Sequence, residues 1–235
     1  MLNLSDFKLT ETTFEVRYDN AYMLWDRAGE IWAKTSSMWP DLKVERVEPS
    51  ITTFRLENKY QLSVFLDKAH IIGLKPSPSL NEFMEKAENF IKLVIQTLKI
   101  TNFTRVGFRL VYIKSFSDKS EAANSLLSTK MLLVPSGRQF GIEGKVVLPR
   151  YAIVCEGISA AARVLLEVRD KKVDFDPPPN IEELSPVHLE KHELLYDVDY
   201  YTLGKVSIGQ LNIKEWLGQI YHLVKRDSKY FLGGS

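Results

Sequence analysis

One stretch near the middle of the chain constrains the fold more than any other. Residues 102–116 read NFTRVGFRLVYIKSF, in which apolar side chains occupy every second position at the centre. The alternating apolar residues are Val106, Phe108, Leu110 and Tyr112. A period of two is typical of a strand that buries one face. We therefore predict a long central strand whose opposite face carries Arg105, Gly107 and Arg109.

The residues before and after this strand show two versions of one pattern. Each version begins with a strand, continues through a helix and several antiparallel strands, and ends in a long helix. We predict an α+β fold with two such repeats, at residues 1–101 and 102–235, and a proline-rich insertion at 171–193. Helices packed on one face of the antiparallel sheets would leave the other face uncovered. We call this uncovered side the open face.

The first repeat begins with an alternating strand at residues 13–18. Asp19 or Asn20 then offers a side-chain oxygen to cap a helix. Trp25, Trp32 and Trp39 belong to the apolar residues of this helix, which recur every three or four positions. We expect the three tryptophans to be buried where the helix packs on the sheet.

The other elements follow from the same two periodicities. A capping box at Ser79–Glu82 predicts the start of a long amphipathic helix, and the last helix is predicted to start at Ser207 or Asn212. A shorter helix is predicted within residues 117–131. The remaining strands are predicted at residues 43–48, 52–57, 60–67, 69–74, 141–148, 151–155, 162–170 and 194–201.

Composition and charge narrow the range of functions. Lysine and arginine number 31 against 30 aspartate and glutamate residues, which argues against a protein whose main task is to grip nucleic-acid backbone. A local basic patch remains compatible with this balance. Cys155 is the single cysteine and lies in an apolar run, so we expect a reducing compartment and a buried thiol. We see no signal peptide and no stretch long enough to span a bilayer, and expect a cytoplasmic protein.

Three stretches together carry a resemblance to a known family. They are Phe14–Arg17, Arg105–Ile113 and Asp197–Tyr201, the last placed before a helix that contains Trp216 and His222. In this order they resemble a sporadically distributed bacterial family of conserved proteins of unknown function. The resemblance implies cargo of mobile elements, in defence or toxin–antitoxin settings, and it transfers no catalytic residue. The outline is also similar in topology alone to the saddle-shaped repeat of the TATA-binding protein.

Arginines dominate the candidate binding residues on the open face. Alternation places Glu15 on this face, together with the candidate partner- or anion-binding residues Arg17, Arg55, Phe65, Arg105, Gly107 and Arg109. Arginines grouped around a glycine gap can bind a phosphate or carboxylate in a bidentate manner, or contact a partner protein. The alternative is a solvated sheet face on which the arginines form ion pairs with neighbouring glutamates.

Two further groups are candidates for metal binding. Glu167, Asp197 and Asp199 could hold a magnesium ion for phosphodiester cleavage, but ion pairs with nearby arginines would explain them equally well. His188 and His192 are four residues apart in the proline-rich insertion, a spacing that zinc can use on a helix. The catalytic zinc motif needs a glutamate directly after the first histidine, and this chain has leucine there.

These observations favour a non-enzymatic interaction or regulatory module, as a subunit of a bacterial complex that binds through the open face. The partner would be a protein, which includes a second copy of the chain; nucleic acid is an open alternative, and no membrane or cofactor is expected. A sensor of small anionic ligands or nucleotides is the first alternative function. A metal-dependent nuclease is the second.

Overall fold

A single nine-stranded sheet forms the body of the protein. The computed structural model describes residues 2–74, 79–132, 142, 145–175 and 187–233. The strand order is β2-β3-β4-β5-β1-β7-β10-β9-β8, and every neighbouring pair is antiparallel. The strands of this sheet are β1 (Lys8–Arg17), β2 (Leu42–Glu48), β3 (Ile51–Leu56), β4 (Tyr60–Phe65), β5 (Lys68–Gly73), β7 (Arg105–Phe116), β8 (Arg150–Glu156), β9 (Ala160–Phe175) and β10 (Val187–Thr202).

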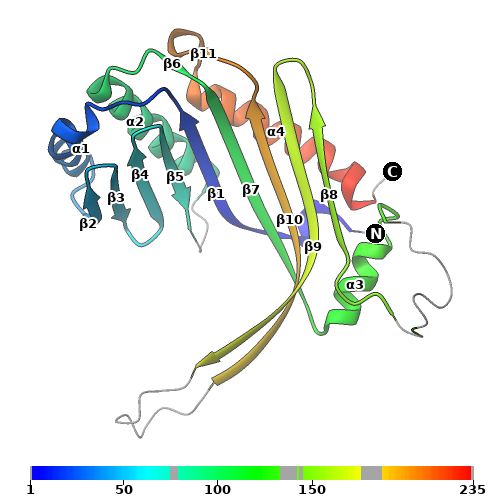
Figure 1. Ribbon diagram of the computed structural model, residues 1–235. Helices are drawn as coiled ribbons and strands as arrows, with labels where there is room; N and C mark the ends of the chain where they lie inside the picture. Colours follow the sequence, from blue (N-terminus) through cyan, green and yellow to red (C-terminus); the bar gives the residue numbers. More distant parts are fainter. Residues whose placement is uncertain (1, 75–78, 133–141, 143–144, 176–186, 234–235) are drawn as a thin grey trace, which may run out of the picture.

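The helices cover one face of this sheet and leave the other uncovered, as Figure 1 shows. They are α1 (Leu24–Met38), α2 (Leu80–Leu98), α3 (Lys119–Leu127) and α4 (Ile213–Leu232). In this helix layer α1 contacts α2, and α2 contacts α4. Short pieces complete the described chain: η1 (Leu4–Asp6), β6 (Asn102–Phe103), β11 (Val206–Ser207) and η2 (Ile208–Gln210). The α+β class predicted from the sequence is confirmed.

The buried side of the sheet follows the alternation in the sequence. Phe14 of β1 and Phe108 of β7 are buried, and they are direct cross-strand partners beneath the helices. The long helix α2 begins where its capping residue predicts, because Ser79 accepts a hydrogen bond from the backbone N–H of Glu82 at 3.3 Å. Asn212 caps α4 in the same way. Apolar alternation and side-chain caps therefore position most of the elements.

The two halves of the chain meet inside one sheet. Strand β1 lies between β5 and β7, and β7 lies between β1 and β10. The first five strands along the chain thus join the last four without a break in the hydrogen-bonded ladder. The division into repeats at residues 1–101 and 102–235 stays a prediction. The proline-rich insertion predicted at 171–193 is shorter in the structure, since β9 continues to Phe175 and β10 already begins at Val187.

The first helix differs from its prediction in two respects. Neither Asp19 nor Asn20 caps α1, because the residue at the N-cap is Met23 and it makes no side-chain cap. Trp25 and Trp32 are 58% and 47% exposed, so the expectation that they are buried is wrong, whereas Trp39 at the end of α1 is partly buried against the core. The residues that face the sheet are their immediate neighbours Leu24 and Ile31, one position earlier along the helix.

Three further predictions fail in the second half. Residues 145–148 do not form a strand, and most of 141–144 lies outside the described residues. Cys155 is exposed on β8, a strand of mostly exposed side chains at the edge of the described sheet. The segment that contains His188 and His192 is part of β10 and is not a helix.

Candidate functional site

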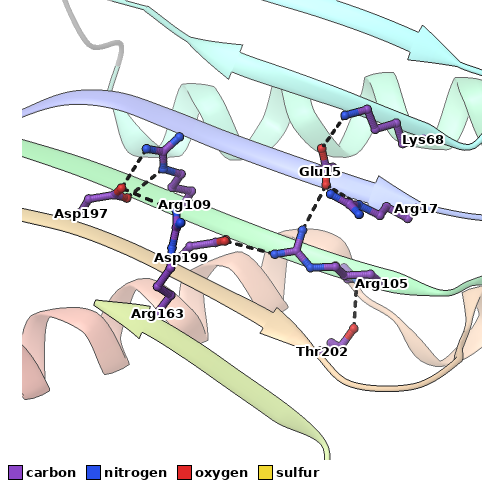
Figure 2. A network of polar contacts seen from close by, with 10 residues as sticks. Glu15, Arg17, Lys68, Arg105, Arg109, Arg163, Asp197, Asp199 and Thr202 are labelled. Atoms are coloured by element: carbon purple, nitrogen blue, oxygen red, sulfur yellow. Dashed lines mark hydrogen bonds and ion pairs between the residues drawn. The ribbon is translucent and has the colours of Figure 1, made fainter. Parts of the chain in front are cut away.

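Charged side chains from the adjacent strands β5, β1, β7, β10 and β9 meet on the open face, as Figure 2 shows. We call this group the charge network. It contains Glu15 and Arg17 on β1, Lys68 on β5, Arg105 and Arg109 on β7, Asp197 and Asp199 on β10, and Arg163 on β9. Because β5, β1, β7 and β10 are neighbours in the sheet, residues far apart in sequence lie within ion-pair distance.

Arg105 lies at the centre of the charge network. Its guanidinium donates to Glu15 at 3.1 Å and to Asp199 at 3.1 Å, and lies 4.3 Å from the ring centre of Tyr201. The same guanidinium lies over Gly107, where an added Cβ would be 3.4 Å from its Nη1 atom. The gap that the sequence predicted at Gly107 is therefore filled by the side chain of Arg105 and is not open to a ligand.

Arg109 forms the tightest pair of the network. Its Nε and Nη2 atoms donate to the two carboxylate oxygens of Asp197, each at 2.8 Å. Asp197 is 1% exposed, and Arg163 lies on its outer side at 3.8 Å. The hydrogen bond to Asp197 raises the pKa of Arg109 above its ordinary value. A bidentate pair around a buried carboxylate fixes both side chains in one geometry.

Glu15 connects the network to the first half of the sheet. Its carboxylate accepts from Arg17 at 2.8 Å and from Lys68 at 3.4 Å, in addition to Arg105. Burial alone would raise the pKa of Glu15, but the hydrogen bond from Arg17 and the neighbouring positive charges lower it below its usual value. Glu15 therefore stays ionised at neutral pH.

The charge network is layered, with acids beneath bases. The carboxylates of Glu15, Asp197 and Asp199 are 19% exposed or less, whereas Arg17 and Arg163 are 49% and 47% exposed. The carboxylates therefore fix the guanidinium groups from below, and the free N–H donors of the outer arginines face solvent. Each arginine of the network has a carboxylate partner, which matches the ion-paired alternative raised from the sequence.

Among the candidate binding residues, Arg55 lies away from this group and Phe65 lies at its margin, beside Lys68. Arg55 is on β3, which β4 and β5 separate from β1, and it pairs with Glu45 at 2.7 Å. Phe65 is on β4, where its ring centre lies 5.0 Å from the amino group of Lys68. The structure thus brings together Arg17, Arg105, Gly107 and Arg109, but leaves Arg55 outside.

The carboxylates proposed for magnesium all have basic partners. Glu167 accepts from Arg169 at 2.7 Å, while Asp197 and Asp199 bind arginines of the charge network. Among the residues that the structure describes, no group of three or more histidine, cysteine or acidic residues could hold a metal ion. The metal-dependent nuclease consequently rests on the sequence alone.

The two histidines of the proposed zinc site lie on a strand and not on a helix. His188 and His192 are four positions apart on β10, a separation of about 13 Å between their backbones at the rise of a strand. The helical spacing of one turn on which the zinc prediction was based is therefore absent from this segment. The Nδ1 atom of His192 instead lies 3.1 Å from Asp170 on the neighbouring β9.

A row of polar residues beside the network was missed by sequence reasoning. Ser63, His70 and Glu15 are successive cross-strand partners on β4, β5 and β1. Burial lowers the pKa of His70 to about 4, so its ring is neutral at physiological pH. The row is not a catalytic triad, because Ser63 is buried and its hydroxyl contacts Thr53 at 3.1 Å, with no hydrogen bond to His70 among the described atoms. The strand pairing alone could have revealed this row.

The open face also holds a small apolar cluster apart from the main core. Val111, Leu165 and Leu195 are buried together, with Ile113 packed against them. They lie on the three adjacent strands β7, β9 and β10, next to Asp197. The cluster makes this part of the open face a packed floor, not an exposed apolar patch.

Comparison with known proteins leaves the family unassigned. No protein-family model matches the chain, and a search of the curated proteins also finds no match. The bacterial family suggested by the three stretches therefore stays a prediction.

None of the described helices has both the length and the apolar character needed to cross a membrane.

Proposed function

We propose that this chain is a non-enzymatic interaction module and that its open face binds a partner protein. The observation that supports the proposal is the layered charge network, in which buried Asp197 and the largely covered Glu15 and Asp199 hold half-exposed arginines at the centre of an uncovered sheet. Arginine is among the residues that contribute most to protein–protein binding energy. The partner surface would present carboxylates or main-chain carbonyls to the remaining N–H donors.

The fixed geometry of the arginines favours such a role. Arg17, Arg105 and Arg109 each donate to at least one carboxylate within 3.1 Å, so their side chains are ordered before any partner arrives. Ordering a long side chain on binding costs about 0.5–1.5 kcal/mol, and a preordered side chain avoids most of that cost. The network therefore resembles a prepared binding surface more than a flexible solvated one.

The charge balance favours a protein over the alternative ligands. An anion sensor needs arginines that are free to close on a phosphate, but the arginines of the network already have carboxylate partners. A nucleic-acid surface needs a basic excess, and the whole chain has a formal net charge of only +1. The anionic-ligand sensor remains the second candidate, supported by the outward N–H donors of Arg17 and Arg163.

The test is co-expression with the proteins encoded by neighbouring genes, followed by purification of any complex. Arg17→Glu combined with Arg163→Glu reverses the outer charges and removes the 3.8 Å contact of Arg163 with Asp197, but it keeps the bidentate pair of Arg109 with Asp197 and the hydrogen bond of Arg105 to Asp199. We expect this double variant to lose the complex, with a decrease in affinity of at least tenfold. Arg226→Glu is the control, because Arg226 is an exposed, ion-paired arginine on α4, in the helix layer on the other side of the sheet.

Three results would contradict the proposal. The first is a complex that survives both charge reversals. The second is a thermal shift with polyphosphate or nucleotides that the double variant loses while no protein partner is found. The third is saturable binding of labelled single- or double-stranded nucleic acid. The expected bacterial setting, a defence or toxin–antitoxin complex, is tested by the same co-expression.

A further inference from the structure

The helix layer ends with α1 at the edge of the sheet that is formed by β2. Along the sheet, α4 contacts α2 and α2 contacts α1, while the strand at this edge is β2. Figure 1 shows α1 at the β2 end of the molecule, beyond α2. The side of α1 that points away from α2 therefore has no helix beside it in the described chain.

This outer side of α1 is aromatic. Arg27 marks the opposite side, since it donates to the carbonyl of Thr97 on α2 at 2.7 Å. Trp25 and Trp32 lie about half a turn away from Arg27, and seven positions apart on one face. Tyr22 extends this exposed row, with its ring centre 5.4 Å from that of Trp25.

The edge strand adds aliphatic residues on the same side of the sheet. Val44 is the cross-strand partner of buried Phe54, so both face the helix layer. Val47 is the partner of Thr52, which is buried on that face too. Val44 and Val47 are nevertheless exposed, because no helix in the described part of the chain lies over them. We call Tyr22, Trp25, Gly29, Trp32, Val44 and Val47 the α1–β2 surface.

A glycine in the middle of this row points to close contact with another backbone. Gly29 lies between Trp25 and Trp32 in an exposed helix interior, where glycine destabilises a helix relative to alanine. A Cβ at Gly29 would meet nothing within 4 Å, so the packing of this chain does not require glycine there. A small residue between two large aromatic ones forms a notch into which a second helix can fit.

We infer that the α1–β2 surface binds an amphipathic helix of a partner protein, which would continue the helix layer over β2. Three aromatic side chains that are about half exposed offer on the order of 300 Å². A standard interface buries about 800 Å² on each partner, so this area suits a single docked helix better than a dimer of the chain.

Charge beside the α1–β2 surface indicates which charged residues the partner helix should carry. Asp26 on α1 is exposed and forms no ion pair within the described residues, whereas Asp41 lies in a separate hollow with Lys43 and Arg55. The basic residues of α1 lie elsewhere, because Arg27 faces α2 and Lys34 lies at the junction with α2. The partner helix should therefore carry lysine or arginine beside its apolar residues.

A partner strand fits this edge less well. Strand β2 has an irregular register between Val44 and Arg46, where Glu45 has no opposite residue in the strand ladder. Its other face carries charged residues that include Arg46 and Glu48. Bulges and charges are devices by which edge strands avoid pairing with another strand. The aromatic row also matches anchors at helical spacing, as in helix-in-groove recognition.

The experiment is a selection from a display library of designed 18-residue amphipathic helices with randomised apolar and charged positions. We expect enrichment of sequences with apolar residues at i, i+3 or i+4 and i+7 and a basic flank. The best peptide, labelled and measured by fluorescence anisotropy, should bind at least tenfold more weakly to the Trp32→Glu and Val47→Glu variants. Tyr230→Glu is the matched control, because Tyr230 is an equally exposed aromatic residue on α4.

A leucine at Gly29 gives a second readout that loss of folding cannot imitate. Gly29→Leu should leave the circular dichroism unchanged and raise the midpoint of unfolding, yet weaken peptide binding at least tenfold. Failure to enrich helical sequences, or equal binding to all variants, would overturn the inference. So would dimers of the free chain that Trp32→Glu dissociates, or vesicle binding that Trp32→Glu abolishes. Binding to the open face is tested by other residues, so either proposal can fail alone.

Discussion

The open face and the α1–β2 surface are both left uncovered by the described chain, yet they differ in how their side chains are satisfied. On the open face, Arg109 and Asp197 complete each other, and Arg105 fills the space above Gly107. On the α1–β2 surface, Trp25 and Trp32 have large exposed areas. The polar side chains of the open face are thus partnered within the chain, whereas the aromatic side chains of the α1–β2 surface are left exposed by the described residues.

The first prediction tests whether the open face stabilises the fold. Arg109→Ala leaves the carboxylate of Asp197 buried with Arg163 as its one remaining partner, at 3.8 Å. Loss of one partner of a buried ion pair costs about 3–5 kcal/mol, so we expect the unfolding free energy to fall by about 3 kcal/mol. Urea denaturation measures this change. The double variant Arg109→Met with Asp197→Leu should regain most of it, and a loss below about 1 kcal/mol would show that the pair is not essential.

The second effect comes from the neutral histidine of the open face. Because the pKa of His70 is lowered to about 4 in the fold, the unfolded chain takes up a proton first as the pH falls. Stability should therefore decrease between about pH 6.5 and pH 4, by at most about 1.4 kcal/mol per pH unit. The lowered pKa of Glu15 acts in a more acidic range, below its ordinary value.

Denaturation at a series of pH values separates these contributions. His70→Gln should flatten the dependence between pH 6.5 and pH 4 and leave the loss at lower pH in place. An unchanged slope in His70→Gln would mean that His70 is protonated equally in both states.

The third prediction compares Gly29, which has open space around it, with a glycine that the fold requires. Gly29→Ala should raise the unfolding free energy by about 0.5–1 kcal/mol, since alanine favours helix and nothing surrounds the new methyl group. Gly233→Ala is the opposite control, because Gly233 ends α4 at φ +82° and its Cβ would lie 3.1 Å from the Cα of Thr129. Thermal unfolding of the two variants should move in opposite directions. A lower midpoint for Gly29→Ala would contradict the open space found there.

The smallest effect is expected at the tryptophans themselves. Trp32→Gln removes an exposed side chain, and surface substitutions of this kind change stability by about 0.5 kcal/mol or less. Chemical denaturation of the isolated chain measures it. A loss of 3 kcal/mol or more, the range for truncation of a buried aromatic residue, would mean that Trp32 belongs to the core.

Most of the fold could be predicted from local periodicity. The strands around Phe14 and Phe108 alternate cleanly, and α2 has both a cap at Ser79 and a continuous apolar side. Local patterns do not record the neighbours of an element, however. The apolar residues of α1 form a wide stripe, of which Leu24 and Ile31 face the sheet while Trp25 and Trp32 face outward. That choice depends on α1 being the last helix of its layer.

The candidate site was predicted as a set of residues but not as an arrangement. Alternation placed Arg105 and Arg109 on the open face, whereas their partners depend on β10 lying beside β7. Asp199 is directly opposite Arg109 in the ladder, yet Arg109 binds Asp197, two residues earlier on the same strand. Such diagonal pairs follow from strand order and side-chain length, neither of which is visible in one sequence.

The unequal lengths of the strands have a consequence for motion. Strand β10 joins β7 only from His192 onward, so residues 187–191 are hydrogen-bonded to residues 171–175 of β9 alone. Figure 1 shows this pair projecting from the body as a two-stranded arm. An isolated ribbon of two strands is marginally stable in water. Amide protons in the arm should therefore exchange with deuterium well before those of β7, and the arm would be the first part of the sheet to separate.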